Sequence, residues 1–428
     1  MYRLTSLAST ARDIARRRTR AQLVVPIVLV AAGSSCMAAT GAFAAIAHSS
    51  SGNIVLTEAD YYNAPPAVTA LPPLLKKCGA ANGVTINRQL IPQANLVPKL
   101  LQDVSTHSFP NLALIDNPNV QQFAATGALQ PLTGIDTTGI VPSIASAGTY
   151  KGKIYGIAPG VNDLALYYNK SLLAAAHLAP PTTWAQLKSD ASALTQGTTY
   201  GFGFSAPNEE EATWNFEPLF WSNGASLLHL NGAPAVQALT FYQSLVTDGS
   251  VPKDVVSWTQ ADVEEQFAAG HLAMMTNGPW QLPVLDKVSG LEFGIVPFPT
   301  PTSAGKPISP LGGEMWTIGR STSTKEEKAL AVVQCMVAAK QSLVWSKTVG
   351  YISTTESVAK QMAKSNPQLA AFAAEIPTAQ ARTGAPAMLG PKYNTVSQAV
   401  WTAIQAVLTG QATPQAALNT AQQQAFSG

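Results

Sequence analysis

The sequence has few charged residues and few cysteines. Only 12% of its 428 residues are charged, 46% are hydrophobic, and three are cysteine. This composition excludes a disordered chain and is typical of a globular protein with an ample core. Three cysteines are too few for a disulfide-rich scaffold, and without a Cys-x-x-Cys pair they indicate no structural zinc site.

The common motifs of catalysis and metal binding are also missing. No Gly-x-Ser-x-Gly elbow or phosphate-binding loop is present, and Gly201-Phe202-Gly203 is only a partial dinucleotide motif. The histidines are scattered without the spacing of metal ligands: His48, His107, His177, His229 and His271. We therefore expect no metal and no cofactor. The missing motifs disfavour an enzyme without excluding one.

Much of the positive charge is concentrated near the N-terminus. Arg16, Arg17, Arg18 and Arg20 lie there, and the net charge of the whole chain is only +2. No basic stripe remains beyond them, so nucleic acid is not an expected partner. An apolar run from Leu23 to Ala32 follows the arginines, and this order is the pattern of an export signal.

Three fates of residues 1–47 are open. Cleavage by signal peptidase fits the small residues near Ala44 and Ala47. The sequence Gly-Ser-Ser-Cys that ends at Cys36 resembles a bacterial lipobox, with Gly in a first position where Leu, Val or Ile is usual. The uncharged stretch 21–47 is also long enough to remain as a membrane anchor. Each fate places the rest of the chain outside the cytoplasm, at the outer face of the plasma membrane or in the periplasm.

Short apolar runs alternate with helical patterns in the first part of the chain. Ile54 to Leu56, Val84 to Ile91 and Leu112 to Ile115 are predicted strands, separated by a helix that ends near Cys78 and another from Asn95 to Val104. The order βαβαβ predicts an α/β lobe with helices on both faces of its sheet. Because 428 residues exceed the size at which single cores usually divide, we expect two lobes.

The second half mixes strands with many helices. Leu164 to Tyr168 is a predicted strand, and the capping-box patterns at Thr183 to Gln186 and at Thr324 to Glu327 each predict the start of a helix. The run Glu209-Glu210-Glu211 could hold a catalytic carboxylate or a cation. Because charge runs usually face water, a solvated loop is the favoured interpretation.

Six motifs, taken in order, resemble segments of the bacterial extracellular solute-binding proteins that include the maltose-binding protein. They are NLALIDNPNVQQFAATGALQPL (111–132), TYKGKIYGIAP (149–159), LALYYNKSLLAAAHLAPPTTWAQL (164–187), FAAGHLAMMTNGPW (267–280), SPLGGEMWTI (309–318) and VLTGQATPQAALNTA (407–421). The similarity covers about residues 52 to 428. Within this group, KTVGYIST (347–354) and the downstream Arg382 resemble glycerol-3-phosphate-binding relatives, although Ser353 stands where Pro is common.

The resemblance implies a two-lobed periplasmic-binding-protein type II fold, an α/β fold with a mostly parallel sheet and flanking helices in each lobe. The first lobe would comprise residues 48–157 and 312–351, and the second residues 158–311 and 352–428. Three crossovers of the chain would join them. Cys78 and Cys335 would then both lie in the first lobe, where they could form a disulfide or remain as two separate buried thiols.

The resemblance also implies a ligand site in the cleft between the lobes, where pockets prefer to form. In relatives the tryptophan that matches Trp280 stacks on the ligand, and a core position is its alternative. Asp116 and Asn117 end a strand, where ligands gather in open α/β sheets, but they could instead cap a helix. Arg382 would suit a phosphate, with a solvated surface position as the alternative. The other expected ligand contacts are Tyr61, Tyr62, Asn162, Asp163, Trp214, Gly313, Glu314 and Tyr351.

The function expected from the resemblance is that of an exported substrate-binding protein of an ABC importer. It would capture a sugar or a polyol phosphate by hinge closure and deliver it to the importer's membrane subunits. The expected protein is a monomer and not an enzyme. A secreted carbohydrate-active enzyme and a ligand sensor for a membrane receptor remain as alternatives, because a fold does not fix a function.

Overall fold

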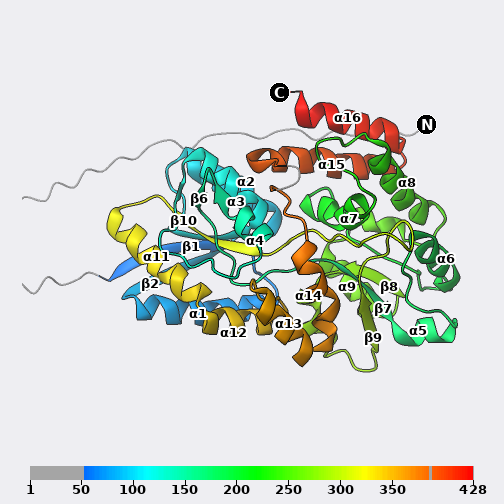
Figure 1. Ribbon diagram of the computed structural model, residues 1–428, viewed down its shortest axis with the longest axis horizontal. Coiled ribbons are helices and arrows are strands. Elements are labelled where there is room, and N and C mark those ends of the chain that lie inside the picture. The colour runs from blue at the N-terminus through cyan, green and yellow to red at the C-terminus, as the bar shows by residue number, and fades with distance from the viewer. Residues whose placement is uncertain (1–52, 385–387, 428) are drawn as a thin grey trace, which may run out of the picture. The chain divides into compact units, whose positions relative to one another are not determined.

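The computed structural model describes residues 53–384 and 388–427 (Figure 1). The predicted export segment 1–47, with Cys36 and the cleavage positions, lies outside these residues. The first sheet has the strand order β2-β1-β3-β10-β4. Its strands are β1 (Ile54–Asp60), β2 (Val84–Leu90), β3 (Leu112–Asp116), β4 (Leu129–Gln130) and β10 (Glu314–Gly319).

The first sheet confirms the predicted βαβαβ order. β1 pairs in parallel with both β2 and β3, and β10 enters from a distant part of the chain, antiparallel to β3 and β4. Along β3, Leu112 and Leu114 belong to one apolar cluster, whereas Ala113 and Ile115 belong to another. Because successive side chains of a strand point to opposite faces, this uninterrupted apolar run needs cover on both faces.

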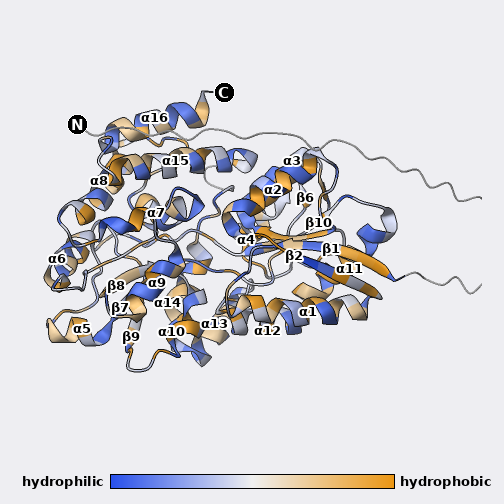
Figure 2. Cartoon of the chain, turned by 180° about the vertical axis from the view of Figure 1, so that it is seen from behind, coloured by the Kyte–Doolittle hydropathy of each residue, from blue (hydrophilic) through white to orange (hydrophobic). Residues whose placement is uncertain are grey.

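Helices provide that cover. Leu112 and Leu114 share their cluster with side chains of α1 (Ala67–Ala81), α11 (Ser323–Val337) and α12 (Ala339–Val349). Ala113 and Ile115 share theirs with α2 (Gln93–Ser105) and α3 (Asn117–Thr126). Figure 2 shows the first sheet between these helices, with orange, apolar segments in its strands.

The second sheet has the order β8-β7-β9. Its strands are β7 (Ala165–Asn169), β8 (Met274–Asn277) and β9 (Phe293–Val296), and both pairings are antiparallel. The prediction of a mostly parallel sheet is wrong for these strands; isolated parallel bridges join Tyr200 to Leu272 and Gly203 to Met275. Long helical connections separate β7 from β8, so no single βαβ unit fixes their relative direction.

The remaining helices and a small hairpin complete the described residues. The hairpin pairs β5 (Thr149–Tyr150) with β6 (Lys153–Ile154). The helices are α4 (Pro142–Ala147), α5 (Lys170–Ala175), α6 (Trp184–Leu194), α7 (Glu210–Ser222), α8 (Ala233–Thr247), α9 (Gln260–Ala268), α10 (Leu282–Leu285), α13 (Glu356–Ser365), α14 (Ala370–Glu375), α15 (Tyr393–Leu408) and α16 (Pro414–Phe426). No single helix of the described residues is long and apolar enough to span a bilayer. The helices α11 and α12 reach the required length and apolar composition only when they are taken together, and they are bent by 62° relative to each other.

The two predicted capping boxes have different outcomes. Thr183 caps α6 as predicted, with both reciprocal hydrogen bonds to Gln186 present. The box at Thr324 is wrong, because α11 begins two residues earlier than that box requires and its N-cap is Thr322, without a side-chain capping bond. Glu326 instead accepts a hydrogen bond from the backbone N–H of Ser321.

Three backbone segments that connect the regions around the two sheets lie side by side. Val161 forms a bridge with Ile352, and Asn162 forms one with Gly312. Farther along, Ile157 forms a bridge with Trp316 at the start of β10. These bonds bring together the chain before β7, the chain before β10 and the chain after α12.

Cys78 on α1 and Cys335 on α11 form a disulfide, with their Cα atoms 5.7 Å apart. The structure therefore has the disulfide, and not the two separate buried thiols that the sequence also allows. The bond joins two helices on the same face of the first sheet across 257 residues of sequence. Disulfides persist mainly in oxidising compartments, so this bond fits a protein that works outside the cytoplasm.

Two carboxyl groups are buried near the crossing segments without hydrogen-bond partners among the described residues. Asp163 lies two residues before the start of β7, and Glu375 ends α14. Both oxygens of each carboxyl group lack a partner. Burial raises the pKa of Glu375 to about 8, and burial together with the charge of Glu375 raises the pKa of Asp163 well above its usual range. The folded protein therefore favours the protonated forms.

Replacing Glu375 with Gln should stabilise the protein more at high pH than at low pH. Because the pKa of Glu375 is higher in the folded chain than in the unfolded chain, its contribution to stability falls as pH rises from the ordinary value of about 4.5 towards about 8. The neutral amide does not undergo this loss. Thermal unfolding should show Glu375→Gln gaining about 2 °C or more over the unmodified protein between pH 5 and pH 8.

The exposed Glu356, which forms an ion pair with Lys360 on α13, provides the matched control. Glu356→Gln should leave the pH dependence of the melting temperature unchanged. If the melting temperatures of Glu375→Gln and of the unmodified protein change in parallel between pH 5 and pH 8, then Glu375 is ionised in the folded protein throughout this range. That result would contradict the prediction.

Candidate ligand-binding site

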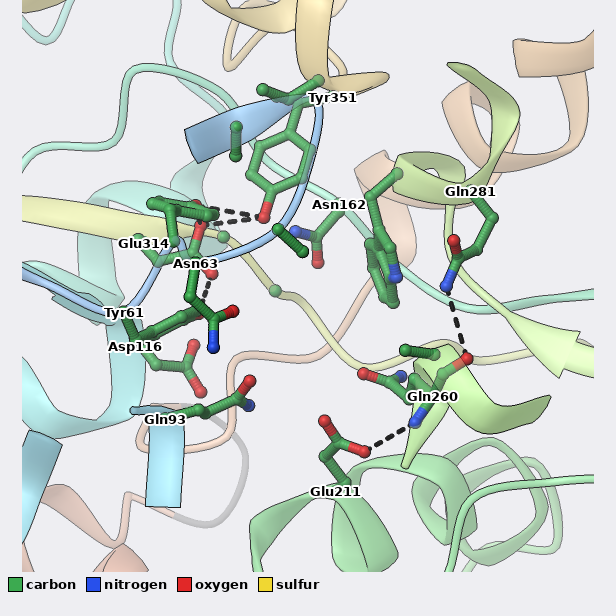
Figure 3. A pocket seen from close by; sticks show the side chains of 18 of the residues that line it. Tyr61, Asn63, Gln93, Asp116, Asn162, Glu211, Gln260, Gln281, Glu314 and Tyr351 are labelled. Atoms are coloured by element: carbon green, nitrogen blue, oxygen red, sulfur yellow. Dashed lines mark hydrogen bonds between the residues drawn. The ribbon is translucent and has the colours of Figure 1, made fainter. Parts of the chain in front are cut away.

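A cavity of about 480 Å³ is lined by residues from the regions around both sheets. It lies within the size range of small-molecule sites. Figure 3 shows Tyr351, Glu314 and Tyr61 on one side of the space and Glu211, Gln260 and Gln281 on the other. Most of the sequence-predicted contacts line this cavity: Tyr61, Tyr62, Asp116, Asn162, Trp214, Trp280, Gly313, Glu314, Tyr351 and Arg382.

Two predicted contacts, Asn117 and Asp163, do not line the cavity. Asn117 is the first residue of α3, and its amide donates hydrogen bonds to the carbonyls of Leu311 and Gly313, 3.1 Å away in each case. It therefore supports the crossing segment behind the site. Asp163 is the unpartnered buried carboxyl described above, and the neighbouring Asn162 lines the cavity.

One wall of the cavity is a cluster of three tyrosines around a single carboxylate. Tyr61 and Tyr62 follow β1, Tyr351 follows α12, and the hydroxyls of all three donate to Glu314 at the start of β10. Burial and the nearby Asp116 raise the pKa of Glu314, while the three donors lower it. The hydroxyl hydrogens are occupied by Glu314, which leaves oxygen lone pairs free.

A buried arginine joins two carboxylates at the base of the cavity. Arg382 Nη2 lies 2.6 Å from Asp116 Oδ1, and its Nη1 lies 2.9 Å from Glu210 Oε1. The guanidinium also lies 4.6 Å from the centre of the Trp214 ring. Its side chain is 2% exposed, so the solvated surface position that the sequence left open is wrong. Each terminal nitrogen has a carboxylate partner, and Nε has none among the described residues, so Asp116 and Glu210 already compensate the charge of Arg382 before any ligand binds.

The run Glu209 to Glu211 is not a solvated loop, contrary to the favoured interpretation. α7 begins at Glu210, and Glu210 and Glu211 line the cavity. Ser397 and Tyr393 of α15 donate to Glu210, in addition to Arg382. Negatively charged side chains at a helix N-terminus are stabilised by the helix dipole, and the N-terminus of α7 lies at the cavity.

The N-terminus of α9 forms the facing wall. Thr259 caps this helix, and Glu211 Oε2 accepts a 2.8 Å hydrogen bond from the backbone N–H of Gln260. Burial raises the pKa of Glu211 to about 7, even though Gln260 and Ser205 donate to it. One turn along α9, Glu264 also lines the cavity and is 7% exposed.

Trp280 lies at the cavity in the short helical turn Pro279–Gln281, immediately after β8. Its ring packs over Gly278, where a Cβ atom would come within 1.9 Å of it, so a glycine is required there. Tyr167 of β7 donates to the carbonyl of Gly278 at 2.7 Å. Trp280 is half-buried, so it is not the core tryptophan of the alternative interpretation.

Two glycines allow the backbone to approach closely beside the cavity. A Cβ on Gly312 would meet Asn162 Oδ1 at 2.0 Å, and Gly313 has a φ of +110°. Gly313 also lies against the carbonyl of Gly160. A side chain at either position would displace Asn162 or the crossing segment.

Several lining residues are not among the ligand contacts predicted from the sequence. They are Asn63, Gln93, Glu210, Glu211, Gln260, Glu264, Glu265 and Gln281. The pattern Thr259-x-x-Asp262 is itself a capping signal and could have located the start of α9. Asn63 and Gln93 are exposed polar residues without a distinguishing pattern.

The cavity lining carries a strong excess of acidic groups. The acidic lining residues are Asp116, Glu210, Glu211, Glu264, Glu265 and Glu314, and the basic lining residue is Arg382. The described residues contain no group of three or more His, Cys, Asp or Glu side chains arranged to hold a metal ion. The site thus has the aromatic faces and hydrogen-bonding groups of a binding cleft for a polar small molecule.

A two-lobed α/β fold with such a cleft is typical of solute-binding proteins, and comparison with known proteins gives the family. The sequence profile of the bacterial extracellular solute-binding proteins matches residues 74–371. The chain belongs to this family, as the six motifs indicated. Because it is a family of binding proteins, the expectation that the chain is not an enzyme is confirmed.

Individual relatives agree with this assignment. A Brucella abortus protein whose name is that of a binding protein is 26% identical over 355 residues, which cover 79% of this chain and 84% of the relative. A Deinococcus radiodurans protein named as an ABC transporter-binding protein is 27% identical, covering 65% and 70%. The crystal structure of a cyclic α-maltosyl-1,6-maltose binding protein from Arthrobacter globiformis is 25% identical, with a TM-score of 0.72 and coverage of 88% and 99%.

Removing the guanidinium of Arg382 should destabilise the protein. Arg382→Met leaves Asp116 and Glu210 together at a largely desolvated site without a counter-ion, which costs about 3 kcal/mol. Chemical denaturation should show this loss, and Asp116→Asn in the same chain should restore part of it. Arg320, an exposed arginine that donates to a backbone carbonyl, provides the control Arg320→Met with little effect. A double variant no more stable than Arg382→Met would contradict the bridging role.

Proposed function

We propose that the protein is the extracytoplasmic substrate-binding component of an ABC importer and that its ligand is a sugar or polyol. The observation that carries the proposal is the cavity, which combines aromatic side chains with many hydrogen-bonding groups from both sides. Sugars have C–H-rich faces that suit aromatic rings, and hydroxyl edges that need polar partners when buried. The Deinococcus and Arthrobacter relatives, by their names, support the importer and the carbohydrate.

The proposed lobes are residues 48–157 with 312–351, and residues 158–311 with 352–428. Their boundaries at 157/158, 311/312 and 351/352 fall within or next to the backbone segments that pair side by side. Closure by bending at these segments would bring the tyrosine wall towards α9 around a ligand. A ligand that contacts both lobes binds the closed form more tightly and so shifts the equilibrium towards it.

The proposed ligand contacts are Tyr61, Tyr62, Asp116, Asn162, Trp214, Trp280, Gly313, Glu314 and Tyr351, which line the cavity. The phosphate-binding role expected for Arg382 is not part of the proposal. Its terminal nitrogens already bond to Asp116 and Glu210, and the surrounding carboxylates would repel a phosphate. An uncharged or positively charged ligand fits better than a polyol phosphate.

Titration with a panel of mono- and oligosaccharides, polyols and glycerophosphates, followed by tryptophan fluorescence, tests the proposal. We expect saturable binding of at least one carbohydrate and recovery of that carbohydrate intact. Glycerophosphates should not bind. Chemical turnover of the ligand, or binding of none of the carbohydrates, would overturn the proposal.

Trp280→Ala should weaken binding of the identified carbohydrate by about tenfold or more, because the stacking face and its buried area are lost. Trp280→Phe retains an aromatic face and should lose less. The melting temperature of each variant serves as the folding control. Unchanged affinity in a folded Trp280→Ala protein would remove Trp280 from the site.

We also propose that the protein stays attached to the outer face of the membrane through a lipid on Cys36. Mass analysis of the mature protein from the membrane fraction should show a chain that begins at Cys36 and carries acyl chains. A chain that begins after Ala44 or Ala47 would show release by signal peptidase instead, and an intact N-terminus would show a retained anchor.

A further inference from the structure

The tyrosine wall presents hydrogen-bond acceptors to the cavity. The hydroxyl hydrogens of Tyr61, Tyr62 and Tyr351 point to Glu314, so each phenol oxygen has only lone pairs left for a ligand. Glu314 itself has several of its acceptor positions filled by these donors. A ligand group at this wall therefore has to bring its own hydrogens.

The facing wall carries carboxylates with unused acceptor capacity. Glu264 is 7% exposed, lines the cavity, and has no hydrogen bond or ion pair with another described residue. Its carboxyl oxygens are not among the closed-off atoms of the described residues, so they can accept hydrogen bonds from a ligand in the cavity. Glu211 Oε2 bonds to Ser205 and Gln260, whereas its Oε1 has no such bond to a described residue and reaches into the space (Figure 3).

Glu211 and Glu264 both belong to the wall formed by the first half of α9. Glu211 accepts from the backbone N–H of Gln260, the first residue of α9, and Glu264 follows Gln260 by four residues on that helix. Both residues line the cavity, so both carboxyl groups border the same space.

No cation of the lining balances this charge. Arg382, the basic residue among those lining the cavity, is already bonded to Asp116 and Glu210. Glu211, Glu264 and the exposed Glu265 thus remain without a basic neighbour in the lining. The electrostatic potential in a cleft lined by one sign of charge attracts a ligand of the opposite sign.

We propose that the cleft selects a carbohydrate that carries a protonated amine, such as an amino sugar or an aminated polyol, with the ammonium group against the acidic wall to which Glu211 and Glu264 belong. This inference rests on the proposed function and specifies its ligand class. The ammonium supplies hydrogen-bond donors and a positive charge to the two carboxylates. The sugar hydroxyls supply hydrogens to the tyrosine oxygens, and Trp280 covers an apolar ring face.

Matched compounds that differ at one group test this inference by calorimetry. The probes are D-glucosamine, N-acetyl-D-glucosamine and D-glucose, the tetramers of the same units in β-1,4 linkage, and the pair 1-amino-1-deoxy-D-glucitol and D-glucitol. The same experiment includes the carbohydrates that bind in the broader panel. We expect the amine of a matched set to bind at least tenfold more tightly than its neutral partners, and added salt to weaken that preference.

Glu264→Gln keeps the shape of the side chain and removes its charge. It should reduce the affinity for the amine about tenfold and leave the affinity for the neutral partners nearly unchanged. Glu292 is an exposed carboxylate outside the cavity lining, so Glu292→Gln is the matched control and should change neither affinity. Melting temperatures of both variants establish that they are folded.

The outcomes separate this inference from the proposed function. If neutral carbohydrates bind as tightly as or more tightly than every amine, the amine selectivity is overturned and the carbohydrate function stands. The same holds if Glu264→Gln leaves the amine affinity unchanged in a folded protein. If no carbohydrate of either kind binds, the proposed function itself fails.

Discussion

The ion bridge from Arg382 to Asp116 and Glu210 connects the two sides of the cavity. Asp116 ends β3 of the first sheet, and Glu210 begins α7 in the other half of the fold. A guanidinium that is almost fully buried has lost its hydration, so its carboxylate partners provide the compensating interactions. Movement of α7 away from β3 must break one of these bonds or carry Arg382 with it. The bridge therefore couples the geometry of the cleft to the relative position of the two sheets.

Several contacts of the site depend on Asp116 and its neighbour. Asp116 caps α3 by accepting from the backbone N–H of Asn117, while it also binds Arg382. Asn117 in turn holds the carbonyls of Leu311 and Gly313. Gly313 leads directly into Glu314, on which the tyrosine hydroxyls converge. One strand end thus fixes a helix, a crossing segment and the acceptor wall, so a change at Asp116 would affect all three.

The sequence alone predicts the elements with clear periodicity. The apolar runs of β1, β2 and β3 and the helix α6 with its capping box at Thr183 are all found in the structure. Most of the ligand contacts expected from the family resemblance also line the cavity. Local patterns specify these features because burial and capping are decided by nearby residues.

The sequence does not distinguish which of two neighbouring polar residues lines the cavity. Asn162 lines the cavity and Asp163 is buried away from it, while Asp116 lines it and Asn117 does not. Adjacent residues at the end of a strand point in different directions, and composition does not reveal which one faces a ligand. The acidic run at Glu210 looked solvated because its buried partner, Arg382, is 172 residues away in sequence. Tertiary pairing of this kind cannot be read from local pattern.

The carboxylates of the cleft carry an energetic consequence for the ligand-free protein. Burial raises the pKa of Glu210, Glu211 and Glu314, which means that their ionised forms are less favourable in the fold than in water. A ligand that donates hydrogen bonds or positive charge to them relieves part of this cost. Because a ligand that binds only the folded state also stabilises that state, the same groups contribute to affinity and reduce the stability of the empty cleft. In the proposed binding mode, an anion meets negative charge that no free basic residue of the lining compensates, whereas a ligand rich in hydrogen-bond donors recovers part of the desolvation cost of these carboxylates.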